Sequence, residues 1–206
     1  QVAALTATEI AAIKTSQLIV LTATQIPALS TDAINALSTG QILSLTTLQV
    51  SSLSTAQIPA LTTSHIQSLT SAQLLSLKTS QIAALSLVDL DALLTTQIQQ
   101  LTTAQVASFT TAQMASLTTG QIVALTTAQI QALTTGQIAV MTPDQLTAME
   151  IVDLQAIKTS QLQSLTTSQI QSLTTDEIVS LTTAQVASLT TSQIVALSTA
   201  EFSALK

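Results

Sequence analysis

The feature that most constrains this chain is an eight-residue period in its large apolar residues. One apolar series begins at Val2 and recurs at every eighth residue to Phe202, and a second begins at Leu5 and recurs to Leu205. Neither series contains a polar residue or a slip of register along the 206 residues. A strict repeat without insertions is typical of a solenoid, in which each unit buries its apolar side against its neighbours.

Three conformations could carry such an octad. In one continuous α-helix, eight residues turn through about 800°, so the apolar stripe would drift by about 80° in each unit and face no fixed partner. In a strand, the two apolar positions are three residues apart and would point to opposite faces. The residues that turn the corners of a β-solenoid are also scarce, with three Gly, three Pro and one Asn. A β-solenoid stays as an alternative, and one short helix in each octad is the favoured prediction.

The local chemistry of each octad supports the helix. In the octad that begins at Thr126, the Thr126 hydroxyl can accept from the backbone N–H of Gln129, and the Gln129 side chain can accept from the N–H of Thr126. Leu125 and Ile130 occupy the two positions of a hydrophobic staple. This capping box, Ser or Thr followed three residues later by Gln, Asp or Glu, is present at 18 of 25 junctions. The pattern therefore predicts a helix of about two turns that restarts at every octad.

Prolines and acids test this register. Pro143 falls at the first helical position after Thr142, where proline is favoured. Pro27 and Pro59, in contrast, fall in helix interiors, where each removes a backbone hydrogen bond. We expect the helix to open locally at these two residues.

Differences between octads indicate how many of them form one coil. The four lysines occupy the cap position of alternate octads only, and Gly and Asp also keep to alternate octads: Lys14, Lys78, Lys158, Lys206, Gly40, Gly120, Gly136, Asp32, Asp144 and Asp176. We therefore predict an all-α solenoid of about 26 short helices, one per octapeptide, with two helices in each 16-residue coil. A weaker 32-residue spacing leaves four helices per coil as an alternative; it is carried by Gln67, Gln99, Gln131 and Gln163.

The chain is expected to be a single continuous octapeptide-repeat solenoid over residues 1–206, and a fragment of a longer array. Its composition excludes several partners. Only 7% of the residues are charged, Arg is absent and the net charge is −6, so nucleic acid is not an expected partner. The absence of Cys excludes disulfides and thiolate metal sites. The apolar runs are far shorter than the ~20 residues that span a bilayer, so membrane insertion is not expected.

No residue of the sequence is predicted to be catalytic, to bind a cofactor or to bind a metal. His65 is the only histidine and replaces the capping Gln of its octad, so it lacks the partners that a metal site or a catalytic triad needs. Three groups of acids lack the spacing of a calcium loop and are interpreted as helix capping and solvation; they are Asp89 with Asp91, Glu150 with Asp153, and Asp176 with Glu177. The chain is therefore not expected to be an enzyme.

Two segments 64 residues apart depart from the repeat in the same way. Residues 87–90 read Leu-Val-Asp-Leu and residues 151–154 read Ile-Val-Asp-Leu, so aliphatic residues stand where most octads have Thr. These segments could be contact patches. The favoured interpretation is a repacked corner within the core.

The whole chain resembles T-T-x-Q-I-x-A-L arrays in very large bacterial secreted or surface proteins described as adhesins or haem-utilisation proteins, most clearly over residues 121–148. The resemblance implies a repetitive extracellular or cell-surface stalk and carries no functional residue with it. We expect a structural rod or spacer that makes protein or surface contacts, with possible end-to-end self-association. The alternatives are a threonine ladder that binds ice or a polymer, and a peptide-binding or protein-binding α-solenoid scaffold.

Overall fold

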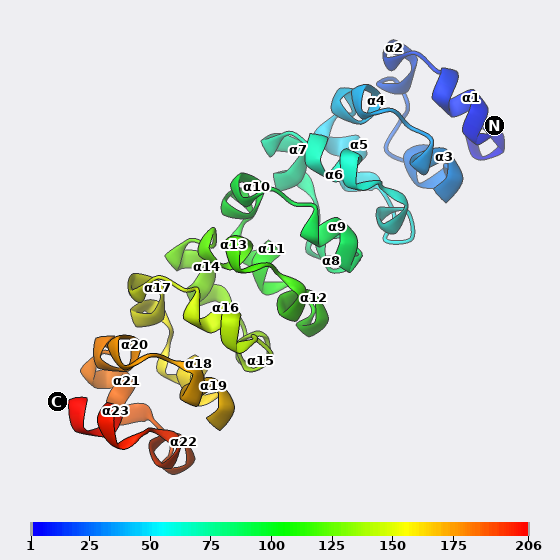
Figure 1. Cartoon of the computed structure of the whole chain (residues 1–206). Coiled ribbons are helices and arrows are strands. Elements are labelled where there is room, and N and C mark those ends of the chain that lie inside the picture. The colour runs from blue at the N-terminus through cyan, green and yellow to red at the C-terminus, as the bar shows by residue number, and fades with distance from the viewer. Residues whose placement is uncertain (1, 206) are drawn as a thin grey trace. The chain divides into compact units, whose positions relative to one another are not determined.

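The computed structural model describes residues 2–205, and every element in that range is a helix. There are 23 α-helices and three 3₁₀-helices, one in each octad, which confirms the prediction of an all-α repeat. The chain divides into two compact units, residues 1–108 and 109–206, and each is described by itself (Figure 1). The prediction of one continuous solenoid stays a prediction.

The first unit contains fourteen short helices. They are η1 (Val2–Ala4), α1 (Ala7–Ala12), α2 (Thr15–Leu18), η2 (Ile26–Ala28), α3 (Thr31–Asn35), α4 (Thr39–Ser44), α5 (Thr47–Ser52), η3 (Ile58–Ala60), α6 (Thr63–Ser68), α7 (Ser71–Ser76), α8 (Thr79–Ala83), α9 (Leu87–Asp91), α10 (Thr95–Gln100) and α11 (Thr103–Ala107).

The second unit contains twelve helices of the same kind. They are α12 (Thr111–Ser116), α13 (Thr119–Val123), α14 (Thr127–Ala132), α15 (Thr135–Ala139), α16 (Pro143–Thr147), α17 (Ile151–Ala156), α18 (Thr159–Gln163), α19 (Thr167–Ser172), α20 (Thr175–Ser180), α21 (Thr183–Ser188), α22 (Thr191–Ala196) and α23 (Thr199–Ala204).

Each octad folds through the same local sequence of conformations. In α14 the N-cap Thr126 is extended (φ −77°, ψ 155°), its hydroxyl accepts from Gln129 N, and the helix ends at an extended Leu133 (φ −57°, ψ 140°). The next octad then begins at Thr134, whose extended backbone starts a new helix. Because two extended residues separate successive helices, the chain changes direction at every octad without any residue of positive φ in the described range.

The two internal prolines open their helices as expected. Pro27 and Pro59 each lie in a short 3₁₀-helix, η2 and η3, and neither octad contains an α-helix. A 3₁₀ turn follows because proline has no backbone N–H to donate to the carbonyl four residues earlier.

One coil of the solenoid takes between three and four octads. In the first unit α1 packs against α3 and α4 against α6, and in the second unit α14 packs against α17 and α16 against α19. The octads of each pair are three apart in sequence. Side chains also join octads that are four apart, since Gln41 Nε2 donates to the carbonyl oxygens of Ile10 and Ile13, 31 and 28 residues earlier. A residue therefore lies over a point about 28 residues back.

The prediction of two helices per 16-residue coil is therefore wrong, and four helices per coil is the closer of the two alternatives. The alternating residues that suggested it are exposed where the structure describes them: Lys14, Lys78, Lys158, Gly40, Gly120, Gly136, Asp32, Asp144 and Asp176. A substitution at an exposed position changes packing very little. Its spacing consequently reports surface chemistry and gives no measure of how octads stack.

The core of each unit is built from the two apolar series. Between the outermost octads both series are buried, as shown by Ile66 and Leu69 in the first unit and by Ile130 and Leu133 in the second. The capping glutamine of each octad is buried as well, at 1 to 5% exposure for residues such as Gln73. A buried amide needs hydrogen-bond partners, and these partners define the most distinctive site in the fold.

Candidate functional site: the glutamine network between coils

The capping glutamine of each octad makes hydrogen bonds with two coils at once. In α19, Gln169 Oε1 accepts from the backbone N–H of Thr166 at 2.7 Å, and Gln169 N donates to the Thr166 hydroxyl at 3.2 Å. The Gln169 Nε2 group then donates to the carbonyl oxygens of Ile138 and Met141, at 3.0 and 2.8 Å. The side-chain amide thus uses its oxygen within its own octad and both hydrogens in the neighbouring coil.

The same arrangement recurs in both units. The Nε2 group donates to residues 28 and 31 positions earlier at 2.6 to 3.3 Å in Gln41, Gln49, Gln57, Gln73, Gln81, Gln97, Gln105, Gln145, Gln161, Gln169, Gln185 and Gln193. We call this set of bonds the glutamine network.

The network solves a problem that very short helices create. The last four carbonyl groups of any α-helix have no partner within the helix, and a helix of five or six residues consists almost entirely of such ends. The N-cap Thr or Ser satisfies the first turn of each helix. The glutamine of a later octad satisfies the last turn, at the carbonyls of one Ile-series and one Leu-series residue. Stacking the coils is therefore what completes each helix.

The sequence contains a signal for this network that the capping-box interpretation did not use. Glu and Gln serve a capping box equally well, because only an acceptor is needed. The third helical position nevertheless holds Gln in 18 octads and Glu in only three. An NH₂ group is required at this position because it faces two carbonyl oxygens, and a carboxylate has nothing to donate.

Four octads keep only half of the capping box. Lys14, Lys78, Leu94 and Lys158 stand at the N-cap, and their side chains make no capping bond. The backbone N–H of each still donates to the following glutamine, as in Lys158 N to Gln161 Oε1 at 2.7 Å. The glutamine therefore caps these helices without a hydroxyl.

His65 substitutes for glutamine in the same geometry, which confirms its interpretation as a capping substitution. Its Nδ1 accepts from Thr62 N at 3.1 Å, and its Nε2 lies 2.6 Å from the carbonyl oxygen of Leu37. These partners fix the neutral tautomer that carries hydrogen on Nε2. Burial lowers the pKa of His65, and the bond to the Leu37 carbonyl partly offsets this effect. Both ring nitrogens are engaged.

The acids also occupy capping geometry. Glu177 accepts from Thr174 N at 2.6 Å and from the Thr174 hydroxyl at 2.9 Å, and Asp89 accepts from Ser86 Oγ at 2.6 Å. These bonds confirm the capping interpretation for both residues. Near the N-terminus, the backbone N–H and then the hydroxyl of Thr6 donate to Glu9 and lower its pKa.

The remaining acids of the three groups differ among themselves. Asp153 is buried and accepts from the hydroxyl of Thr127 at 2.8 Å, a contact across the coil boundary. Asp91, Glu150 and Asp176 are exposed. Among residues 2–205, His, Asp and Glu side chains do not gather in groups of three that could hold a metal ion.

The two aliphatic segments lie at the surface, so the prediction of a repacked corner within the core is wrong. Leu87 and Val88 are 48% and 68% exposed, and Ile151 and Val152 are 48% and 54% exposed. They occupy the first two helical positions, which face away from the core in every octad. Their fourth residues, Leu90 and Leu154, are buried like other members of the apolar series.

The fold and the glutamine network define a class: an α-solenoid repeat protein with one short helix per octapeptide. The model of the ALTTAQ repeat family matches five overlapping segments, residues 10–47, 31–63, 88–119, 117–150 and 146–183. Together these segments cover residues 10–63 and 88–183, which is more than half of the chain. The chain belongs to the ALTTAQ repeat family. A comparison with curated proteins finds no match. Every helix in the described range is too short to cross a bilayer.

Proposed function

We propose that this chain is a non-catalytic structural rod, stalk or spacer of a bacterial surface or secreted adhesin-like protein, located outside the cell or on its surface. The contacts that we propose for it are with proteins or surfaces and, end to end, with further copies of the chain. The observation that carries the proposal is the glutamine network. A side chain that repeats every eight residues joins each coil to an earlier one, which is what a spacer under tension needs.

The use of the polar side chains supports this proposal over catalysis. Repeated Gln, Thr and Ser residues make up most of the polar surface, and their hydrogen bonds serve the backbone. The one histidine has both ring nitrogens engaged. A nucleophile needs an adjacent free base, and a capping hydroxyl such as that of Thr102 instead accepts from a backbone N–H.

The alternatives have less support. Binding of ice or a polymer would need flat ranks of free threonine hydroxyls, but the first threonine of each pair caps a helix, as Thr102, Thr110 and Thr118 do. A peptide-binding scaffold would need anchoring aromatic or Arg side chains. The chain has two Phe and no Trp, Tyr or Arg. We expect the purified chain to show no thermal hysteresis.

Force spectroscopy on the chain, tethered at both ends, tests the spacer proposal. Opening one coil releases about 28 residues, or roughly 100 Å of extended chain. We expect extension in steps related to this length, at forces well above those that stretch an unfolded chain, and recovery of the folded length on relaxation. A featureless extension like that of an unfolded polypeptide would overturn the proposal.

A further inference from the structure

We infer that the chain associates head to tail with a second copy, through hydrogen-bond donors at its N-terminal edge and acceptors at its C-terminal edge. This inference depends on the solenoid geometry and is independent of the stalk function proposed above, so either can fail alone. It extends the glutamine network from the interior of one molecule to the boundary between two.

The N-terminal edge carries two amide groups that have no acceptor. Gln17 and Gln25 accept from Lys14 N at 3.0 Å and from Thr22 N at 2.8 Å, as interior glutamines do. Their Nε2 groups have no acceptor among the described residues, because the residues 28 and 31 positions earlier would precede residue 1. Gln17 is exposed and Gln25 half-buried, whereas Gln41, one coil further on, is buried.

The C-terminal edge carries the complementary acceptors. In the interior, the carbonyl oxygen of Leu165 accepts from Gln193 Nε2 at 2.9 Å. The equivalent carbonyl oxygens of Leu189 and Leu197 have no donor within residues 2–205. The carbonyl oxygen of Ile194 accepts only the backbone N–H of Leu197, at 3.2 Å. The donors of one edge therefore match the acceptors of the other in kind and in number per octad.

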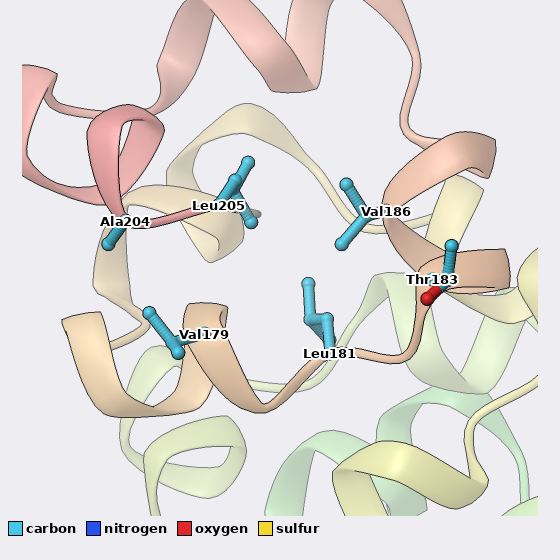
Figure 2. A pocket seen from close by; sticks show the side chains of 6 residues that line it. All are labelled: Val179, Leu181, Thr183, Val186, Ala204 and Leu205. Atoms are coloured by element: carbon cyan, nitrogen blue, oxygen red, sulfur yellow. The ribbon is translucent and has the colours of Figure 1, made fainter.

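Apolar surface accompanies these polar groups at both edges. The C-terminal edge has an open pocket of about 140 Å³, and the side chains of Leu181, Val186 and Leu205 converge on it (Figure 2). At the opposite edge Val2 and Leu5 are half-buried, although later members of the same two series are fully buried. The sequence prediction that the terminal coils expose apolar residues is confirmed. Burying both edges together removes this apolar surface from water.

The octad register specifies how the two edges meet. If a second copy continues the register after a gap of two residues, its Gln17 takes the position 31 residues after Ile194 and 28 residues after Leu197. Its Gln25 takes the same relation to Phe202 and Leu205. Each of these glutamines then donates to two carbonyl oxygens of the first copy. A head-to-tail contact of this kind does not close, so the product is a linear oligomer.

Sedimentation velocity over a range of concentrations tests the inference. We expect the unmodified chain to form oligomers as its concentration rises, and the double variant Gln17→Glu and Gln25→Glu to associate at least about tenfold more weakly. The double variant Gln67→Glu and Gln131→Glu makes the same charge change at exposed positions away from both edges, and it should associate like the unmodified chain. Circular dichroism checks that all variants stay folded.

A gain-of-function variant makes the test independent of any loss of folding. Glu9 occupies the glutamine position of its octad but cannot donate, and in the proposed register it faces the carbonyl oxygens of Val186 and Leu189 of the other copy. Glu9→Gln should therefore strengthen association, and Leu205→Lys, at the apolar pocket, should weaken it. A chain that stays monomeric to millimolar concentration, or association that is equally strong in the Gln17→Glu, Gln25→Glu variant, would overturn the inference.

Discussion

Replacing Gln169 by Glu removes the donors of one node of the glutamine network and keeps its local cap. A glutamate oxygen can still accept from Thr166 N, as Glu177 does from Thr174 N at 2.6 Å. The two bonds from Nε2 to Ile138 and Met141 are lost. Each such bond contributes about 1 kcal/mol net, and an acceptor left buried without a donor costs about 1–3 kcal/mol. We expect the free energy of unfolding to fall by roughly 2–4 kcal/mol.

The matched control is Gln171→Glu, because Gln171 lies in the same helix, is exposed and undergoes the same change of charge. Its effect should be within about 0.5 kcal/mol. Urea titrations followed by circular dichroism compare the two variants. The difference should narrow below about pH 4, where a protonated glutamate can donate one O–H. Equal urea midpoints for the two variants at neutral pH would refute the assigned role of the network.

Three further variants probe neighbouring features. Because burial lowers the pKa of His65, the unfolded chain binds more protons, so stability should be full above about pH 6.5 and fall as the pH drops toward the lowered value; His65→Gln should abolish this dependence in melts between pH 5 and 8. Glu177→Gln should raise the free energy of unfolding by about 1–2 kcal/mol by supplying the missing donors, while Asp176→Asn at the neighbouring exposed position should not. Leu133→Asp should destabilise by about 4 kcal/mol or more, whereas Gln131→Asp should be nearly silent in the same titration.

The helices and their caps could be predicted from the sequence because they depend on residues within one octad. Thr126 and Gln129 lie three residues apart, and that spacing alone specifies the capping box. Pro27 and Pro59 likewise act on their own helices, so the local opening was predictable. In each case the interacting groups are held together by the chain itself.

The coil could not be predicted in the same way, because it depends on side chains that meet across about 28 residues. The choice of Gln over Glu was the available signal, and it becomes interpretable only once two carbonyl oxygens are known to face that position. The exposure of Val88 and Val152 was missed for a related reason. An aliphatic side chain suggests burial by its chemistry, but its position in the octad decides which way it points.

Cross-linking of introduced cysteines tests the central claim, that one coil takes between three and four octads. The chain has no cysteine of its own, so each pair reacts without background. Thr127 and Asp153 are in hydrogen-bond contact at 2.8 Å across the coil boundary. Asp144 is exposed and lies close to the place that a 16-residue coil would bring next to Thr127.

The measurement is the rate of intramolecular cross-linking by a short bifunctional thiol reagent in dilute solution. The account predicts rapid cross-linking of the pair Thr127→Cys and Asp153→Cys, and little reaction of the pair Thr127→Cys and Asp144→Cys. Rapid cross-linking of the second pair with little reaction of the first would contradict it.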